Sequence, residues 1–292
     1  MSWTVYQVIL RLYTPLHIGY LEVGYLRRTR PYVTGRVLRG ALVNRVGRNH
    51  NICSEDPRDP FRPVSKTFAA YLTFTYFYPA LKEGSAWEAQ FPWENEACFR
   101  RRFLSSYTST ALAYPQQTAA EGLLHEIEFI SPRTLDTGEQ VYLMGYVFVQ
   151  EERLNRKKYD WVKALRRFQL GGERGYGWGD ARLAREPAQV KDRLFGKICF
   201  ETDEKWPVLH LKENEAVLGH TFAKNATLCG PVEPMVGREW RADNNSRDYI
   251  GQHLAYNGVY FAPGSRTRHA SEFILGEGGY WQMISFQESK QP

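Results

Sequence analysis

The sequence predicts an α+β fold, and three features of its 292 residues support this prediction. Residues 3–12 alternate apolar and polar side chains and are rich in β-branched and aromatic types, which is typical of a strand. Apolar side chains at Leu38, Ala41 and Leu42 follow helical spacing. A glycine-rich run at residues 170–179 separates a helical pattern from a short strand-like one. Strands and helices are therefore expected to alternate along the chain.

The first helix is expected to begin at Thr34 or Gly35, because threonine is a favoured N-cap residue, and to end at Gly47. Residues 49–120 are irregular in character and are interpreted as a long insertion between core elements. Within it, residues 68–78 are interpreted as a β segment.

Residues 123–130 and 140–150 alternate on both sides of a turn that contains Pro, Asp and Gly, which predicts a hairpin. Residues 155–168 predict the most regular helix of the chain, and residues 181–184 a short strand after the glycines. The helix prediction depends on four apolar side chains that share one stripe: Leu154, Trp161, Leu165 and Phe168.

In chain order, the expected elements are strand, helix, insertion, two strands, helix, glycine loop and strand. This is the β-α-β-β-α-β order of a ferredoxin-like fold, which RNA-recognition (RRM-like) modules also use. We therefore expect a ferredoxin-like domain over residues 1–186, with the insertion at about 49–120. A smaller β-rich or degenerate ferredoxin-like domain is expected over residues 187–292.

The positive charge of the chain is concentrated in two windows. The net charge is +6, yet residues 1–48 hold eight arginines and one acidic residue, and residues 153–185 hold ten cations and three acidic residues. Each window therefore carries +7 in an otherwise acidic chain, which favours a polyanionic partner. Arginines outnumber lysines by 27 to 11, which suits bidentate contacts to phosphate, although a GC-rich genome would also favour arginine.

Cysteine usage and hydropathy exclude other classes of protein. The four cysteines lie far apart without a C-x-x-C pair, so we expect neither a metal site nor a disulfide framework, no cofactor, and a cytoplasmic location. The most apolar stretch, residues 68–81, is interrupted by Thr73, Thr75 and Pro79 and is too short to span a bilayer, so no membrane partner is expected.

The glycine-rich loop offers chemistry suited to RNA. Bare backbone can approach a phosphate closely, one arginine can pair with it, and two aromatic rings can stack on unpaired bases. A dinucleotide-binding loop would need a strand before it and a helix after it, and a P-loop would need Gly-Lys-Ser/Thr. The structural alternative is a sharp turn whose aromatic rings fill the core. The residues concerned are Gly171, Gly172, Arg174, Gly175, Tyr176, Gly177, Trp178 and Gly179.

Three motifs in this order resemble those of the RAMP superfamily of CRISPR-associated proteins. They are Leu16-His-Ile-Gly19, the segment Tyr32-Val-Thr-Gly-Arg-Val-Leu-Arg-Gly-Ala-Leu42, and the loop Leu170-Gly-Gly-Glu-Arg-Gly-Tyr-Gly-Trp-Gly179. The match spans roughly residues 5–185. The resemblance implies a protein that binds CRISPR guide RNA inside a type III or type I effector ribonucleoprotein.

The Gly-Gly-Glu-Arg form of the loop, followed by a second domain, is most similar to the five-type subunit of type III (III-D-like) complexes, which caps the complex at the 5′ tag of the guide. Residues 230–240 and 261–265 are similar to segments of such subunits. The resemblance implies a non-catalytic subunit whose partners are the guide RNA, the seven-type backbone subunits and the large polymerase-like subunit, with target RNA bound indirectly. Besides the glycine loop, the expected RNA contacts are His17, Gly19, Arg27, Arg28, Arg30, Tyr32, Arg36 and Arg39.

Two alternatives within the superfamily remain open. A seven-type backbone subunit that cuts target RNA would carry an aspartate before the first helix, whereas residues 20–34 contain only one carboxylate, Glu22. A six-type endoribonuclease that processes guide precursors would use a general base, for which His17 and His50 are the candidates. In that group the glycine loop usually lies near the C-terminus, whereas more than a hundred residues follow it here.

Overall fold

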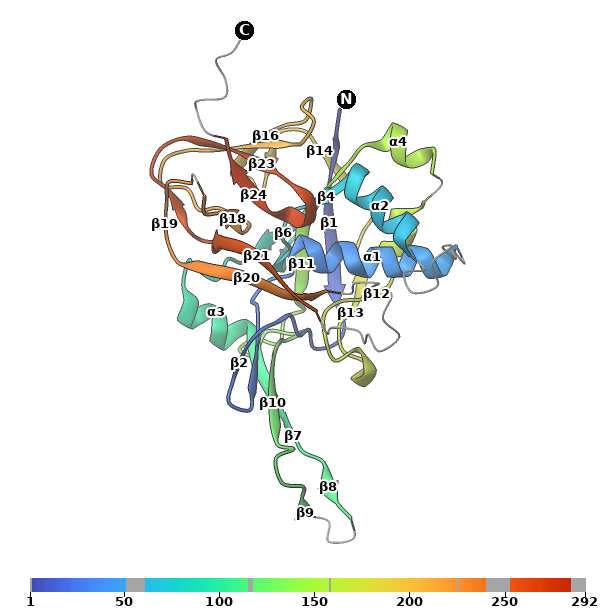
Figure 1. Ribbon diagram of the computed structural model, residues 1–292, viewed down its shortest axis with the longest axis vertical. Helices are drawn as coiled ribbons and strands as arrows, with labels where there is room; N and C mark the ends of the chain where they lie inside the picture. The colour runs from blue at the N-terminus through green and yellow to red at the C-terminus, as the bar shows by residue number, and fades with distance from the viewer. Residues whose placement is uncertain are drawn as a thin grey trace.

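A central antiparallel sheet organises the protein (Figure 1), whose computed structural model describes residues 2–50, 61–114, 118–157, 159–224, 226–239 and 253–284. The strand order is β12-β13-β1-β11-β5-β6, with β14 also on β1 and β4 also on β11. The strands are β1 (Thr4–Leu12), β4 (Leu72–Phe74), β5 (Tyr78–Glu83), β6 (Ala86–Ala89), β11 (Tyr142–Val149), β12 (Phe168–Gln169), β13 (Asp180–Leu183) and β14 (Ala188–Val190).

This strand order is that of a ferredoxin-like sheet. β1 pairs antiparallel with β11 on one side and with β13 on the other, and β4 and β5 pair with the far side of β11. A helical segment lies between β1 and β4, and another between β11 and β13. The predicted α+β fold is therefore confirmed. The second strand of the β-α-β-β-α-β order, however, is supplied by β4 and β5 from the range expected to be an insertion, and not by residues 123–130.

Helices cover one face of the central sheet. They are α1 (Gly35–Asn49), α2 (Arg62–Tyr71), α4 (Glu151–Asn155) and α5 (Trp161–Leu165). Alternate residues of β1, such as Val8 and Leu10, pack in one core with Leu38 and Leu42 of α1. Every second side chain of β1 thus points into the core beneath the helices, as the alternating pattern of residues 3–12 predicts.

A second sheet covers the opposite face, and both sheets contribute to its core. Val5 and Phe148 of the central sheet pack there with Leu209 and Phe273. The order is β15-β16-β17-β23-β24-β18-β21-β20, and β19 pairs separately with β22. Their bounds are β15 (Arg193–Leu194), β16 (Ile198–Glu201), β17 (Val208–Leu211), β18 (Thr221–Phe222), β19 (Leu228–Cys229), β20 (Val232–Glu239), β21 (His253–Phe261), β22 (Arg266–Thr267), β23 (Ser271–Leu275) and β24 (Trp281–Met283).

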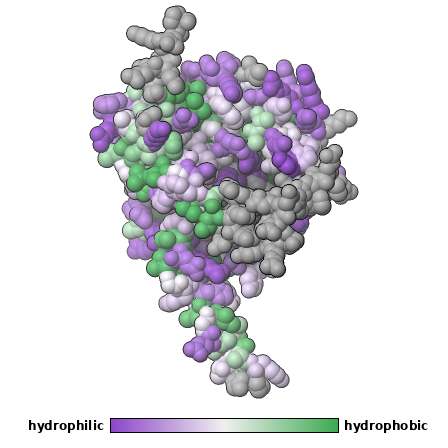
Figure 2. Space-filling view, in the orientation of Figure 1, coloured by the Kyte–Doolittle hydropathy of each residue, from purple (hydrophilic) through white to green (hydrophobic). Residues whose placement is uncertain are grey.

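A third sheet forms a finger that projects from the body, and its lower part is the long extension in Figure 1. Its order is β2-β3-β10-β7, and a small pair, β8 with β9, lies nearer the tip. Large apolar side chains such as Tyr107, Leu112 and Tyr114 are exposed here, and Figure 2 shows apolar surface along the finger. The elements are β2 (Gly19–Val23), β3 (Leu26–Thr29), α3 (Glu96–Phe103), β7 (Leu104–Ser109), β8 (Leu112–Ala113), β9 (Thr118–Ala119) and β10 (His125–Ile130).

The range interpreted as an insertion divides between two layers. α2, β4, β5 and β6 belong to the central sheet and its helical cover, whereas α3, β7, β8 and β9 build the finger. The expected β segment at residues 68–78 is only partly strand, because α2 continues to Tyr71. No helix within the described ranges is long and apolar enough to cross a membrane.

The predicted hairpin is wrong, because its two arms belong to different sheets. β10 pairs with β3 and β7 in the finger, whereas β11 pairs with β1, β4 and β5 in the central sheet. The two sides of the intervening turn are joined by an isolated bridge between Arg133 and Gln140 and by a few hydrogen bonds, such as Val141 N–H to the Pro132 carbonyl, but they form no two-stranded ladder.

The predicted continuous helix at residues 155–168 is also wrong, because the chain breaks between α4 and α5. The Asp160 side chain accepts a hydrogen bond from the Lys163 backbone N–H at 2.8 Å and caps the new helix. The expected apolar stripe is nevertheless buried: Leu154, Trp161, Leu165 and Phe168 all contribute to the helical core.

Two glycines of α1 should respond in opposite ways to alanine. An added Cβ at Gly40 would have no heavy atom within 4 Å, so Gly40→Ala should raise the free energy of unfolding by about 1 kcal/mol. At Gly47, which does not end the helix as expected, an added Cβ would collide with the Phe61 ring. Overpacking costs about 1–3 kcal/mol, so Gly47→Ala should lower stability. Urea unfolding measures both, and a gain for Gly47→Ala would contradict this packing.

Candidate nucleic-acid interface

The C-terminal half of α1 and the glycine-rich loop line one open groove of about 680 Å³. α1 packs against α5 and β12, which brings Arg45 and Arg48 from the first window of positive charge to the same surface as Arg167 and Arg174 from the second. The lining residues are Ala41, Asn44, Arg45, Arg48, Arg167, Phe168, Gln169, Arg174, Gly175, Gly177 and Asp180.

Four arginines dominate the groove. Arg45 and Arg48 are one turn apart on α1 and exposed, Arg174 is exposed in the loop, and Arg167 lies just before β12. The side chains of Arg45, Arg48 and Arg174 form no ion pair within the described part of the chain. Three guanidinium groups without a carboxylate partner among the described residues therefore face one concave surface, which attracts an anion such as phosphate.

Asp180 holds the fourth arginine at the edge of the groove. Its carboxylate accepts from Arg167 at 3.1 Å and from Arg182 at 2.9 Å. Burial alone would raise the pKa of Asp180, but these hydrogen bonds outweigh burial and lower it. Asp180 therefore remains ionised and orients Arg167.

The base of the glycine loop is clamped to the turn that follows β1. Gly172 N–H donates to the His17 carbonyl at 2.9 Å, and Gly179 N–H donates to the Pro15 carbonyl at 2.8 Å. Gly171 and Gly179 have positive φ angles of 72° and 79°, and an added Cβ at either would collide with a neighbouring carbonyl oxygen. Folding alone therefore explains glycine at these positions.

The tip of the loop, residues 174–177, is exposed to solvent. Arg174–Tyr176 form one turn of 3₁₀ helix that ends at Gly177, where φ is 81°. An added Cβ at Gly175 would meet nothing within 4 Å, and its φ is not positive. Neither packing nor backbone conformation requires glycine at 175, so its lack of a side chain leaves room for a ligand to approach the backbone.

The two aromatic rings of the loop differ in environment. Trp178 packs edge-on against Phe129 at 5.1 Å and against Tyr107 at 6.4 Å between ring centroids. Tyr176 is 76% exposed. Tyr176 can therefore stack on a base without rearrangement, whereas Trp178 already forms part of an aromatic wall.

His17 lies beneath the loop rather than in the groove. It is 6% exposed, and its Nδ1 lies 2.7 Å from the Glu128 carbonyl. An added Cβ at Gly19 would lie 2.8 Å from His17 Nε2, so Gly19 provides space for the ring. His50 lies elsewhere, at the C-terminus of α1 beside Tyr159. Within the described ranges no three His, Cys, Asp or Glu side chains are arranged to hold a metal ion.

Arg27 and Arg28 lie on β3 and already contact carboxylates. Arg27 is 4.0 Å from Glu22 and 3.9 Å from Glu173, and Arg28 is 3.7 Å from Glu128. These distances exceed those of a hydrogen bond, and the side chains are partly exposed, so both arginines can exchange these contacts for phosphate.

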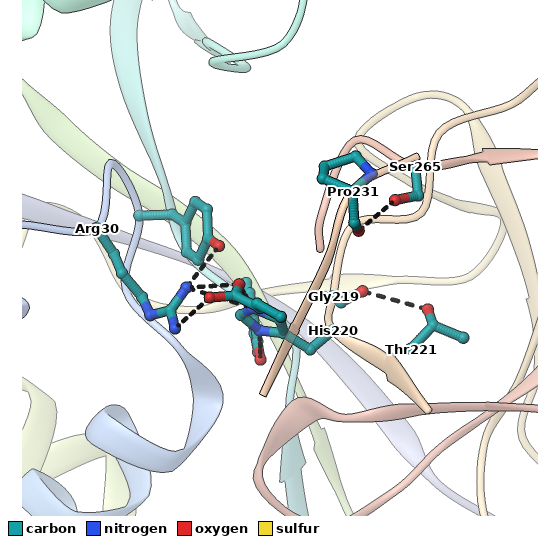
Figure 3. Close-up of polar contacts among 9 residues, drawn as sticks. Arg30, Gly219, His220, Thr221, Pro231 and Ser265 are labelled. Atoms are coloured by element: carbon teal, nitrogen blue, oxygen red, sulfur yellow. Dashed lines mark hydrogen bonds and ion pairs between the residues drawn. The ribbon is translucent and has the colours of Figure 1, made fainter. Parts of the chain in front are cut away.

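Arg30 and Tyr32 belong to a buried network, which we call the latch: Arg30, Tyr32, Tyr76, His220 and Glu233. Arg30 donates to both carboxylate oxygens of Glu233 at 2.9 and 3.0 Å. His220 is fully buried; its Nδ1 lies 2.6 Å from the Tyr76 hydroxyl, and its Nε2 contacts Glu233. Figure 3 shows Arg30 and His220 converging from the two sides of this network. The latch joins the segment after β3 to the C-terminal sheet.

Charges in the latch stabilise one another. Burial alone would raise the pKa of Glu233, but hydrogen bonds from His220 and Arg30 outweigh burial and lower it to about 2. Burial lowers the pKa of His220, and the Glu233 hydrogen bond only partly offsets this. Glu233 is therefore an anion beside a neutral imidazole, and this arrangement suits Tyr76 donating to Nδ1 and His220 Nε2–H donating to Glu233.

Acid is expected to weaken the latch in two steps. Both groups have a lower pKa in the folded protein than their ordinary values, which are 6.5 for His220 and 4.5 for Glu233. Their contribution to stability is therefore complete above pH 6.5, falls first as His220 titrates, and falls again between pH 4.5 and about 2. Each group adds a slope of at most about 1.4 kcal/mol per pH unit.

Urea unfolding at a series of pH values measures this dependence. His220→Gln should flatten the curve just below pH 6.5 and leave the Glu233 step in place. An unchanged curve in that window would show that His220 does not titrate with folding.

The first turns of α1 face the C-terminal sheet, not the groove. Arg39 forms an ion pair with Glu277, and an added Cβ at Gly237 of β20 would lie 3.3 Å from Arg36 Nη1. The structure therefore brings the glycine loop together with Arg45, Arg48 and Arg167, which the sequence analysis did not select. Arg45 and Arg48 lie in the first basic window at helical spacing, and that signal could have identified them.

Comparisons with known proteins give only distant similarity. No family model matches the sequence, and no curated protein matches it. A chain of a type III-B Cmr-beta complex in the apo state is 10% identical with a TM-score of 0.41, over 64% of this chain and 98% of that chain. A chain of Cmr-beta bound to cognate target RNA is 10% identical with a TM-score of 0.39, over 61% and 96%.

A further chain, from Cmr-beta bound to cognate target RNA and AMPPnP, is 12% identical with a TM-score of 0.49, over 89% of this chain and 84% of that chain. Identities and TM-scores this low do not assign a family or a function.

Proposed function

We propose that this protein is a non-catalytic, guide-RNA-binding subunit of a type III CRISPR effector complex, positioned near the 5′ tag of the guide. The observation that carries the proposal is the groove between α1 and the glycine loop, where Arg45, Arg48 and Arg174 have no carboxylate partner among the described residues. The RAMP-like motifs lie in matching order on a ferredoxin-like sheet and support the same proposal.

The groove suits the backbone of a single strand. Guanidinium groups pair with phosphate oxygens, and three or four such contacts would hold a short stretch of RNA without reading its sequence. Tyr176 at the loop tip offers an exposed ring to an unpaired base, which a duplex would not present.

A binding role rather than cleavage is supported by the groove chemistry. The described lining residues include one ionisable carboxylate, Asp180, which two arginines hold in its ionised form, and they include no histidine, lysine or tyrosine. The His17 ring is buried and hydrogen-bonded beneath the loop. The described residues of this groove therefore do not provide a general base for attack by a 2′-hydroxyl.

The test is binding of 5′-labelled, single-stranded repeat RNA by the full chain over a range of salt concentrations. Each phosphate contact on a single strand contributes about −0.7 to the slope of log affinity against log salt, so three or four arginines predict about −2 to −3. Binding without salt dependence, or no binding, would overturn the proposal. A discrete cut in the same RNA would support the six-type alternative.

The position in the complex is tested by the RNA that copurifies with the protein in its assembled complex. Protection of the 5′ tag from nuclease digestion by this subunit would support the proposed five-type position beside the seven-type and large polymerase-like subunits. Protection of the spacer alone would support a seven-type position.

A further inference from the structure

We propose that an aromatic pocket behind the glycine loop holds one unpaired base of the bound RNA, and that Glu173 makes this pocket select bases with an amino group over uracil. The inference rests on the proposed function, because it assigns a base site to the strand whose phosphates occupy the arginine groove. Cytosine, adenine and guanine each carry an exocyclic amino group that can donate to a carboxylate, and uracil carries none.

The pocket has a volume of about 310 Å³ and lies between the loop and the finger sheet. Phe129 and Ile127 of β10 and Tyr107 of β7 line one side, and Tyr176 and Trp178 of the loop line the other. Its size is at the lower end of the range for small-ligand sites, and its aromatic lining suits a flat heterocycle.

The same short loop separates the pocket from the arginine groove. Arg174, Gly175 and Gly177 line the groove, whereas Glu173, Tyr176 and Trp178 line the pocket. A strand whose phosphates contact Arg174 could therefore place the attached base on the other side of the loop. This continuity favours a nucleotide over a side chain of a protein partner.

Glu173 is the carboxylate among the described lining residues, which also include the polar Ser109 and His125, and we assign the selectivity of the pocket to it. Its side chain is only 20% exposed, and its carboxylate accepts no hydrogen bond from the described residues; the nearest cation is Arg27 at 3.9 Å. An unsatisfied carboxylate against aromatic rings disfavours an apolar occupant and favours a donor. Uracil would instead present its single N3–H between two carbonyl oxygens, and the carboxylate repels those oxygens.

The backbone of Glu173 also points to a ligand. Its φ is 54°, in the left-handed region that glycine adopts easily and glutamate does not. Glu173 lines the pocket and directly precedes the loop tip, and such strained residues gather at binding sites.

Exposed rings at the rim can stack on the base. Tyr107 is 58% exposed and Tyr176 is 76% exposed, and they approach the pocket from its two walls. Stacking is tolerant of sequence, so the rings would supply affinity and Glu173 would supply discrimination.

Fluorescence anisotropy with oligo(C), oligo(A) and oligo(U) RNA tests the inference on the full chain at one salt concentration. The wild-type protein should bind oligo(C) and oligo(A) about tenfold more tightly than oligo(U). Glu173→Gln should weaken binding of oligo(C) and strengthen binding of oligo(U), because an amide can donate to the uracil carbonyl that a carboxylate repels. Changes of opposite sign cannot come from misfolding.

Glu22→Gln is the matched control, since Glu22 lies 4.0 Å from the same arginine but does not line the pocket. It should leave the ratio between oligonucleotides unchanged. Equal, salt-dependent binding of all three oligonucleotides by the wild-type protein would contradict the selectivity assigned to the pocket. It would not contradict the proposed function. Absence of salt-dependent binding to any of them would overturn both.

Discussion

Replacing Arg45, Arg48 and Arg174 together with alanine is expected to lower the affinity for single-stranded RNA by about 100-fold at about 0.1 M salt. The three side chains line the groove and have no ion pair within the described part of the chain, so no described carboxylate competes with phosphate for them. Losing three contacts should also reduce the magnitude of the salt slope by about two. Anisotropy titrations at several salt concentrations measure both quantities.

A second triple variant, Arg101→Ala with Arg166→Ala and Arg185→Ala, is the matched control. It removes the same charge from exposed arginines that do not line the groove. If both triples weaken binding equally, the affinity depends on net charge alone and the groove is not the site. Circular dichroism of both variants confirms that the fold is retained.

The sequence identified the helix that carries the groove arginines Arg45 and Arg48 but not the end of the helix at which they lie. Arg36 and Arg39 are close to the family-like motif, yet they face Gly237 and Glu277 of the C-terminal half. Spacing along a helix shows which side chains share a face. It does not show which segment packs at each end, because that depends on contacts between residues far apart in the sequence.

The same distinction explains which elements could be predicted. The alternation of side chains correctly indicated strands at β10 and β11. β11, however, pairs with β1, β4 and β5 and not with β10. Local turn chemistry favoured a hairpin, and burial of β11 in the central sheet outweighed it. The glycine loop was located correctly because its turn requirements are local, including positive φ at Gly171 and Gly179.

The latch shows the limit of sequence reasoning most clearly. Arg30 and Glu233 are 203 residues apart, and no local pattern links them. From sequence, Arg30 was expected to contact RNA as part of the first basic window. In the structure its guanidinium is 12% exposed and bound to a carboxylate. One arginine of this basic window therefore joins two sheets, and its position in a charged segment does not by itself indicate an RNA contact.

Glu233→Leu or Arg30→Met alone is expected to lower the free energy of unfolding by about 1–3 kcal/mol. Glu233→Leu leaves the largely buried Arg30 without its carboxylate, and Arg30→Met leaves Glu233 with only the neutral His220. The double variant should recover a large part of this loss, since neither charge remains. Urea unfolding of all four proteins measures the coupling. Additive losses would show that the pair does not interact in the folded protein.

RNA affinity of the same variants separates the latch from the groove. If Arg30 acts only in the latch, Arg30→Met should weaken RNA binding no more than Glu233→Leu does, because both variants disturb the same network. Loss of RNA affinity in Arg30→Met alone, with stability close to that of the wild type, would identify Arg30 as an RNA contact and contradict the latch. The Arg30 guanidinium is already bound to Glu233, so it is not expected to need phosphate as a partner. The guanidinium groups of Arg45, Arg48 and Arg174 have no ion-pair partner among the described residues.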